Sequence, residues 1–269
     1  MTETSTGDLF SLDGKVALIT GAAKGLGKIF SQTLAEAGAH VVCADFKPEL
    51  LKETVASLEL KGHKVSSVIA DVSSPEDVKS MVSDTMSQFG RLDIAINNAG
   101  IVTKPCRFHE ITLDDWDRLV AIDLTGIFIC MKEELRWMVT QQSGIIVNIA
   151  SVAGLRGVAP EHKPRANYVA AKHGVIGLTR QAALEYAPDN IRVNAIAPGW
   201  FGGTDLSRER TQGKVEIDIS LEQKRNGFIP LGRKGSLNEL RGLILFLASD
   251  ASSYVTGQVL AIDGGVTAR

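Results

Sequence analysis

The sequence predicts an α/β fold in which one parallel sheet of about seven strands is doubly wound, with helices on both faces. Three observations favour this class: short apolar runs alternate with helix-length segments, most runs lack apolar/polar alternation, and no repeat or low-complexity linker divides the chain. Strands covered by helices on both faces read as continuous apolar runs. We therefore expect residues 1–269 to form a single domain.

The elements follow one another in a regular order. The first strand is predicted over residues 15–20, a glycine-rich turn follows it, and residues 25–38 then show helical spacing. The later strands are expected at residues 39–45, 65–71, 92–97, 144–151, 191–198 and 258–263. The later helices are expected at residues 48–60, 75–89, 113–139, 168–186 and 237–248. Ser74, followed by Pro75, is a typical helix start.

Charge and hydropathy exclude several classes of function. Lys and Arg number 29 against 31 for Asp and Glu, so the formal net charge is -2. A basic field that would hold nucleic acid or anionic lipid is therefore absent. No uncharged apolar run approaches the ~20 residues that cross a bilayer, and the first ten residues lack the basic start of a secretory signal. We expect a cytoplasmic protein with a small-molecule substrate and neither a nucleic-acid nor a membrane partner.

The residues that most often bind metals show no metal-site pattern. Cys43, Cys106 and Cys130 are odd in number and far apart, which is typical of reduced thiols. The five histidines lack metal-ligand spacing. We expect no metal site.

A dinucleotide site is predicted at the first strand-to-helix turn, which reads TGAAKGLG over residues 20–27. Glycines here permit a tight turn and let backbone N–H groups approach a pyrophosphate at the helix N-terminus. The candidate contacts within the turn are Gly21, Lys24, Gly25, Leu26 and Gly27. Asp45 ends the second strand, where a carboxylate accepts hydrogen bonds from the adenosine ribose and repels a 2′-phosphate. This Rossmann-type pattern favours NAD over NADP, although the Lys24 cation favours NADP.

Three further residues have the chemistry of a proton-transfer site. Tyr168 and Lys172 are four residues apart on a predicted helix, so both side chains lie on one face. Ser151 follows an apolar run, at the carboxyl end of a predicted strand. Ligands of parallel sheets bind at that edge.

With these motifs, the sequence resembles the short-chain dehydrogenase/reductase family over nearly its whole length. The shared motifs, in chain order, are the glycine-rich turn, Asp71-Val72, the N-N-A-G of residues 97–100, Ser151, Tyr168-x-x-x-Lys172, Pro198-Gly199 and the tail of residues 246–265. The resemblance implies NAD(P)-linked oxidation of an alcohol or reduction of a carbonyl. It also implies a homo-oligomer, a dimer or tetramer.

The resemblance assigns further cofactor contacts. It places Asp71 and Val72 at the adenine, and Thr204 near the nicotinamide carboxamide. The remaining implied contacts along the cofactor are Asn97, Ala99, Gly100, Pro198 and Gly199.

The chemistry gives each residue of the catalytic group a role. Hydride transfer to a carbonyl develops negative charge on oxygen, so the site must supply a proton donor and a hydrogen bond. We interpret Tyr168 as the acid/base and Ser151 as the hydrogen-bond partner of the substrate oxygen. A free phenol is too weak an acid to act as a base at neutral pH. We therefore expect the Lys172 cation to stabilise the phenolate and to hold the nicotinamide ribose.

Asp123 departs from the family pattern, because the family usually has Asn at this position of an Asn-x-x-Gly motif. An Asp accepts hydrogen bonds or lies near an ammonium, but it lacks the donor of an amide. We count Asp123 as a catalytic candidate. The alternative interpretation is a helix-interior carboxylate with a structural partner.

The substrate side carries no transferable pattern. Residues 200–235 are dense in charge and are interpreted as a substrate loop or lid. Residues 160–166 form part of an enlarged loop over the substrate mouth. We expect an NAD-dependent oxidoreductase acting on a secondary alcohol or ketone such as a sugar acid, polyol or cyclic alcohol. Two alternatives are a 3-oxoacyl thioester reductase, which would favour NADPH, and a non-catalytic NAD-binding regulator.

Overall fold

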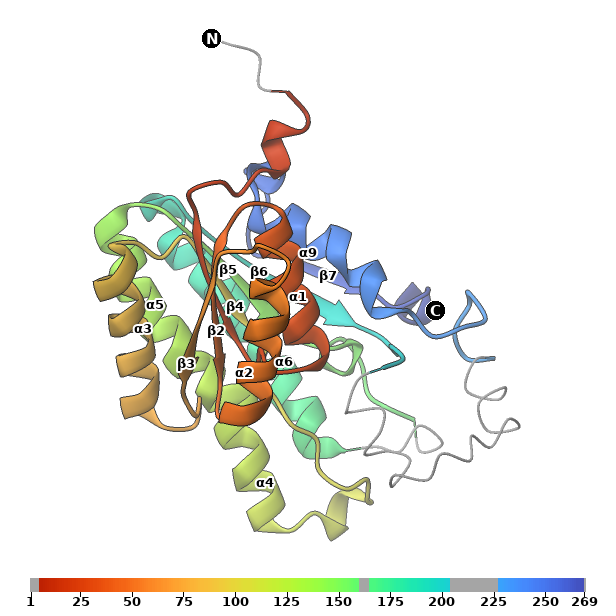
Figure 1. Cartoon of the computed structure of the whole chain (residues 1–269). Coiled ribbons are helices and arrows are strands. Elements are labelled where there is room, and N and C mark those ends of the chain that lie inside the picture. Colours follow the sequence, from red (N-terminus) through yellow and green to blue (C-terminus); the bar gives the residue numbers. More distant parts are fainter. Residues whose placement is uncertain (1–4, 160–164, 204–226, 269) are drawn as a thin grey trace.

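The computed structural model describes residues 5–159, 165–203 and 227–268. Its centre is one seven-stranded sheet in the order β3-β2-β1-β4-β5-β6-β7 (Figure 1). The strands are β1 (Val16–Thr20), β2 (His40–Asp45), β3 (Val65–Ile69), β4 (Ile94–Asn97), β5 (Gly144–Ile149), β6 (Ile191–Pro198) and β7 (Val259–Ile262). All six neighbouring pairs are parallel. The predicted doubly wound parallel sheet is confirmed.

Helices cover both faces of the sheet. The principal helices are α1 (Gly25–Glu36), α2 (Pro48–Glu59), α3 (Pro75–Phe89), α4 (Leu113–Val120), α5 (Ile127–Gln141), α6 (Ala166–Tyr186) and α9 (Arg241–Ala248). Side chains of α1, α2 and α9 share one apolar cluster with the sheet. Side chains of α3, α5 and α6 share the other cluster. Figure 1 shows these two sets of helices on opposite sides of the strands.

The burial of the strands follows from this layering. Every residue of β1 and β4 is buried, and β5 and β6 each have one residue that is only partly buried. The edge strands β3 and β7 are more exposed, since each has a neighbour on one side only. Continuous apolar runs in the sequence are therefore the signature of strands covered on both faces.

The structure corrects the prediction of one regular helix over residues 113–139. A π-helical turn, Ala121–Gly126, separates α4 from α5. The turn buries Asp123, whose carboxylate Oδ1 accepts a 2.7 Å hydrogen bond from the backbone N–H of Ile101. Gly126 lies against Val72, where a Cβ atom would come within 3.0 Å of the Val72 side chain. The π-helical turn therefore points a carboxylate into the protein interior. Such π-bulges are frequent at functional sites.

The order of the strands determines where a ligand binds. The chain builds β1, β2 and β3 outward on one side, then crosses back to place β4 on the other side of β1. The connections after β1 and β4 leave in opposite directions, which opens a crevice at the carboxyl ends of these strands.

Two other expectations can be compared with the described residues. No helix among them is long and apolar enough to cross a bilayer. The helix predicted over residues 237–248 begins as a 3₁₀ turn, Leu237–Leu240, before α9.

Candidate active site

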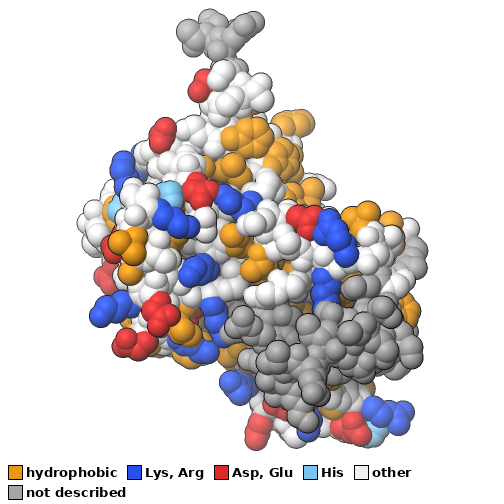
Figure 2. Space-filling model, turned by 45° about the vertical axis from the view of Figure 1, so that its right-hand side comes forward, with side chains coloured by type: hydrophobic (Ala, Val, Ile, Leu, Met, Phe, Trp, Pro, Cys, Tyr) orange, Lys and Arg blue, Asp and Glu red, His pale blue; other side chains and the backbone are white. Residues whose placement is uncertain are grey.

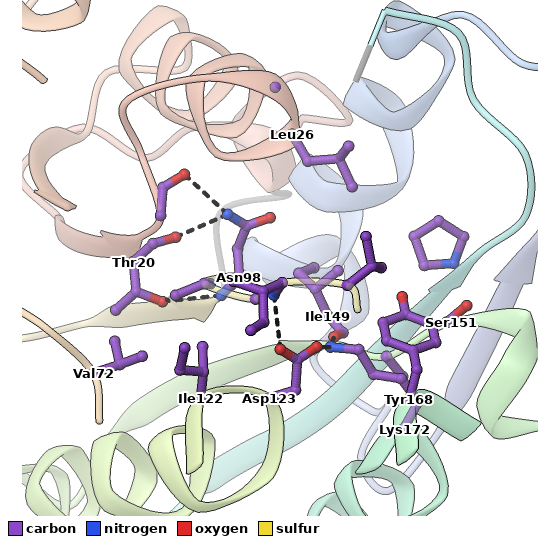
Figure 3. Close-up of a pocket in the computed structure, with 18 of the residues that line it drawn as sticks. Thr20, Leu26, Val72, Asn98, Ile122, Asp123, Ile149, Ser151, Tyr168 and Lys172 are labelled. Atoms are coloured by element: carbon purple, nitrogen blue, oxygen red, sulfur yellow. Dashed lines mark hydrogen bonds and ion pairs between the residues drawn. The ribbon is translucent and has the colours of Figure 1, made fainter. Parts of the chain in front are cut away.

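A pocket with a volume of about 620 Å³ lies along the carboxyl edge of the sheet. Its lining comes from the segments that follow β1, β2, β3, β4, β5 and β6, together with the π-helical turn and α6. This volume lies in the range of pockets that bind small molecules and cofactors. The pocket thus occupies the crevice that the strand order predicts, and Figure 3 shows the side chains gathered in it.

The glycine-rich turn forms one end of the pocket by close backbone packing. Gly21 has a φ of +66°, and a Cβ atom there would lie 2.9 Å from the Cα of Ala99. A Cβ atom at Gly27 would overlap the carbonyl oxygen of Gly21. The side chain of Asn98 fastens the turn, because its Nδ2 donates to the carbonyl oxygens of Thr20 (2.9 Å) and Gly21 (3.2 Å). Only glycine fits these positions without moving the neighbouring backbone.

Asp45 lies at the end of β2 and is only 8% exposed. Its Oδ2 accepts a 3.1 Å hydrogen bond from the backbone N–H of Ala23, and its Oδ1 accepts a 3.0 Å bond from the N–H of Lys47. The first bond ties the carboxylate to the glycine-rich turn. Asp45 lines the pocket, and each of its oxygens has acceptor capacity beyond these single bonds.

Most of the predicted cofactor contacts line this one pocket. They are Gly21, Lys24, Gly25, Leu26, Asp45, Asp71, Val72, Ala99, Gly100, Tyr168, Lys172, Pro198 and Gly199. Gly27 is not part of the lining, and its place in the site is the close contact with Gly21. Thr204 lies outside the described residues.

The placement of Asn97 differs from the expectation that it lies along the cofactor. Its side chain is 1% exposed, does not line the pocket, and donates from Nδ2 to Glu134 Oε2 at 3.0 Å. The next residue, Asn98, lines the pocket instead. β4 ends at Asn97, and ligands of parallel sheets bind just outside the carboxyl ends of the strands. The end of the predicted strand was therefore a signal that favoured Asn98.

Ser151, Tyr168 and Lys172 meet at the other end of the pocket (Figure 3). Ser151 follows β5, and its Oγ accepts a 3.1 Å hydrogen bond from the N–H of Ala153. Tyr168 and Lys172 project from the first turns of α6, with the Lys172 Nζ 5.5 Å from the centroid of the Tyr168 ring. The structure thus brings together the three residues that the sequence singled out.

Lys172 and Asp123 form a buried ion pair beside these hydroxyl groups. Their Nζ and Oδ2 atoms are 3.1 Å apart, and Nζ also donates to the carbonyl oxygen of Ile149 at 3.1 Å. Burial lowers the pKa of Lys172, but the Asp123 carboxylate, and after it Tyr168, raise that pKa above its ordinary value. Burial raises the pKa of Asp123, against the opposing effects of Lys172 and the Ile101 N–H. The ion pair keeps the lysine charged inside the protein.

Sequence reasoning missed Asn167, the residue before Tyr168. Its buried side chain accepts a 2.9 Å hydrogen bond at Oδ1 from the N–H of Tyr168. Its Nδ2 donates to the Asp115 carbonyl oxygen at 3.1 Å and to Thr103 Oγ1 at 3.2 Å. Arg165 adds a 2.6 Å bond from Nε to the Thr103 carbonyl oxygen. The start of α6 is thereby tied to α4 and to the segment after β4.

The described ends of the predicted lid, residues 200–235, are fastened together. Phe201 and Gly235 form a parallel β-bridge. The N–H of Gly235 donates to the Trp200 carbonyl oxygen at 2.9 Å, and the N–H of Gly202 donates to the Gly235 carbonyl oxygen at 3.0 Å. Trp200 and Phe201 both line the pocket. Residues 204–226 of this segment lie outside the described residues.

A doubly wound parallel sheet with a glycine-rich turn, a strand-end carboxylate and a Ser-Tyr-Lys group in one pocket defines a class, the nicotinamide-dependent oxidoreductases. The chain matches the family model described as enoyl-(acyl carrier protein) reductase over residues 21–267. It belongs to the short-chain dehydrogenase/reductase family, whose members act on CH–OH groups with NAD(P).

Three similar proteins illustrate the range of the family. A 3-oxoacyl-[acyl-carrier-protein] reductase of Thermotoga maritima is 40% identical over 255 residues, covering 95% of this chain and 98% of that protein. A cis-4-hydroxycyclohexanecarboxylate dehydrogenase of Sinomonas cyclohexanicum is 40% identical over 254 residues, covering 94% and 97%. The crystal structure of a gluconate 5-dehydrogenase from Burkholderia cenocepacia, in complex with NADP and tartrate, has a TM-score of 0.90 at 33% identity, covering 98% and 100%.

Proposed function

We propose that this oxidoreductase prefers NAD and transfers hydride between the nicotinamide and a secondary alcohol or ketone. The observation that carries the cofactor preference is the buried Asp45 carboxylate at the end of β2, inside the pocket. A carboxylate at this point accepts hydrogen bonds from the ribose hydroxyls of NAD and repels the 2′-phosphate of NADP.

The residues of the pocket fit a dinucleotide. The close packing of Gly21 and Gly27 leaves backbone free of side chains at the start of α1, where a pyrophosphate is stabilised by N–H groups and the helix dipole. Lys24 and Lys47 also line the pocket and are the cations that would favour NADP. Asp45 outweighs them in this proposal because two backbone hydrogen bonds fix it in place.

The cofactor preference is tested by measuring kcat/KM with NAD and with NADP. We expect the wild-type ratio to favour NAD, and Asp45→Asn to reduce that ratio at least tenfold, corresponding to ~1.4 kcal/mol. Glu49→Gln is a matched control, since Glu49 is exposed at the start of α2 and does not line the pocket. A wild-type preference for NADP, or an unchanged ratio in Asp45→Asn, contradicts the proposal.

We assign the chemistry to the residues around Tyr168. NAD supplies or accepts the hydride when it is bound. The Tyr168 hydroxyl transfers the proton of the substrate oxygen, and the Ser151 hydroxyl donates a hydrogen bond to that oxygen. The Lys172 ammonium, charged through its ion pair with Asp123, stabilises the phenolate form and holds the nicotinamide ribose. Asp123 acts through Lys172 and is a positioning residue.

The described lining near Ser151 and Tyr168 is mainly apolar and favours a compact carbon skeleton. It includes Val152, Val158, Val169, Trp200 and Phe201, with the buried Arg165 as a cation. We propose a cyclic alcohol, polyol or sugar acid as the substrate class. The name of the cyclohexane-carboxylate relative agrees with a ring alcohol, and that of the gluconate relative agrees with a sugar acid.

Two alternatives make different predictions in one substrate screen. A 3-oxoacyl thioester reductase, like the Thermotoga relative, would turn over acetoacetyl thioesters faster with NADPH than any cyclic alcohol with NAD. A regulator would bind NAD without turnover. The presence of Ser151, Tyr168 and Lys172 disfavours this alternative, because a regulator needs no proton donor. Oxidation of cyclic alcohols, polyols and sugar acids with NAD, measured beside these thioesters, separates the three functions.

We further propose that the protein is a cytoplasmic homo-oligomer. Large apolar side chains are exposed along consecutive helices: Trp116 on α4, Phe128 and Trp137 on α5, and Leu184 on α6. Large apolar side chains exposed on several helices favour burial of these helices against another subunit. Light scattering of the purified protein gives the mass in solution, and a monomer at micromolar concentration contradicts the proposal.

A further inference from the structure

A network of hydrogen-bonded, buried polar side chains begins at Asn97, the residue before the pocket-lining Asn98. Asn97 at the end of β4 donates from Nδ2 to Glu134 Oε2 (3.0 Å) on α5 and to Asn148 Oδ1 (3.1 Å) on β5. Asn148 in turn donates to Thr179 Oγ1 on α6 at 3.0 Å. All four side chains are buried, with Glu134 0% exposed. An ionisable group this deep must be neutral or paired with an opposite charge.

Two oxygen atoms of these four side chains have no hydrogen-bond partner among the described residues: Glu134 Oε1 and Asn97 Oδ1. They belong to the two residues that already share one hydrogen bond. Both atoms are acceptors if Glu134 is ionised, so neither can satisfy the other. A single proton on Oε1 would turn it into a donor and give the Asn97 oxygen a partner.

Among the residues that the structure describes, none of those packed around Glu134 supplies a compensating cation. On α5, the Cys130 thiol is coupled to Glu134 electrostatically, and Glu133 pairs with Arg136. The buried Lys172 of α6 pairs with Asp123. The residues that α3 buries are Val78, Met81, Val82 and Thr85, all uncharged, and β4 and β5 contribute the amides of Asn97 and Asn148.

We propose that Glu134 is a neutral carboxylic acid whose Oε1–H donates to Asn97 Oδ1. This closes a pair of reciprocal hydrogen bonds between acid and amide. The pair positions the end of β4 and, through it, the pocket segment that follows. In that segment, the N–H groups of Asn98 and Ala99 both donate to Thr20 Oγ1, at 3.0 and 3.1 Å. Glu134 is therefore a positioning residue for the cofactor end of the pocket.

Electrostatics agrees with this assignment. Burial raises the pKa of Glu134 to about 7, against a smaller lowering by the Asn97 hydrogen bond. A carboxyl whose pKa is higher in the folded than in the unfolded protein contributes its full stabilisation below the unfolded pKa. That contribution is lost as the pH rises through the folded pKa. The window for Glu134 runs from its ordinary value of 4.5 to about 7.

The test uses two substitutions of Glu134 with nearly the same shape. Glu134→Gln keeps both hydrogen bonds, because its Nε2 donates where the acid proton donates, and it cannot ionise. Glu134→Met keeps the length of the side chain and removes both bonds. The full-length protein is used throughout, and cofactor binding is read from the KM for NAD at saturating cyclic alcohol, or from fluorescence titration with NADH.

Infrared spectroscopy reads the proton directly. The difference spectrum of wild type minus Glu134→Gln should contain the C=O band of a protonated carboxyl at pH 6 and lose it on the alkaline side of pH 7. In urea unfolding, the unfolding constant of wild type relative to Glu134→Gln should rise about tenfold per pH unit across the window. The absence of the band at pH 6, or parallel stability curves for the two proteins, overturns the proposal.

The positioning role has its own readout. Glu134→Met should raise the KM for NAD several-fold with little change in kcat, and Glu134→Gln should restore the wild-type KM. A Gln variant as impaired as the Met variant would mean that the carboxylate charge is needed, which also overturns the proposal. If Glu134→Met does not fold, the infrared and stability comparison with Glu134→Gln decides alone. Neither of those measurements depends on the cofactor or substrate assigned above.

Discussion

The ammonium of Lys172 and the carboxylate of Asp123 lie 3.1 Å apart, and both side chains are almost wholly removed from water. A buried charge with one oppositely charged partner depends on that partner for its ionisation. Lys172 also contacts the ring of Tyr168. The ion pair therefore links a residue of the π-helical turn to the proton chemistry that we assign to Tyr168.

Asp123→Asn should make the activity sensitive to alkaline pH. Asp123 raises the pKa of Lys172 against the effect of burial, so wild type keeps the ammonium above the ordinary lysine range. Without the carboxylate, the effect that most strongly raises the pKa of Lys172 is lost. Burial then lowers that pKa. The alkaline limb of kcat/KM should move to lower pH, with turnover near neutral pH retained. Superimposable pH profiles of wild type and variant would contradict this.

Tyr168→Phe should remove turnover and leave cofactor binding. General acid–base catalysis contributes about 10²–10⁴-fold to rates, so kcat should fall by at least two orders of magnitude. The phenyl ring keeps its place over Lys172 because the ring contact does not need the hydroxyl. Stopped-flow turnover and NADH fluorescence titration measure the two effects separately. A variant with near-normal kcat would remove Tyr168 from the mechanism.

Asn167→Ala should lower kcat more than it raises the KM for NAD. The substitution removes the hydrogen bonds to the Tyr168 N–H, the Asp115 carbonyl and Thr103. The first turn of α6 then loses its fixed position relative to α4, and misplacement of a reacting group by about 1 Å costs up to ~10²-fold in rate. Steady-state kinetics with both substrates varied gives the comparison. Equal loss in kcat and in NAD affinity would indicate general destabilisation instead.

Gly27→Ala should destabilise the protein by about 1–3 kcal/mol and weaken cofactor binding. Its Cβ atom would overlap the Gly21 carbonyl oxygen, which is backbone that cannot swing aside. Gly242→Ala on α9 is the control, since nothing lies within 4 Å of a Cβ atom there. A helical glycine in open space gains up to ~1 kcal/mol on replacement by alanine. The midpoint urea concentration of unfolding should fall for Gly27→Ala and rise for Gly242→Ala, relative to wild type.

The strands and most helix bounds were predictable because they depend on local patterns. Apolar runs without alternation located all seven strands, and proline at the first helical position located the start of α3. The π-helical turn was not predictable, because residues 119–129 are mostly apolar and a local change of the helical period leaves no visible break in such a run.

The site was predictable where a motif specifies a residue type at a fixed place in the fold. Ser151, Tyr168 and Lys172 line one pocket as expected. Apart from the N–H of Tyr168, the hydrogen-bond partners named for Asn97 and Asn167 lie on other elements, tens of positions away in the chain. Such partners depend on tertiary packing, which composition and spacing do not encode.

The bridge between Phe201 and Gly235 joins the two ends of the charge-dense segment to each other. Its two ends meet at one point on the pocket rim, where the Phe201 ring leaves no room for a Cβ atom at Gly235. The described part of the segment before Gly235 also packs on the end of the sheet, because Ile229 is buried and the N–H of Leu231 donates to the carbonyl oxygen of Gly264, just after β7. A chimera that exchanges residues 204–226 for those of a relative, with these anchoring residues kept, tests whether the segment determines the substrate range.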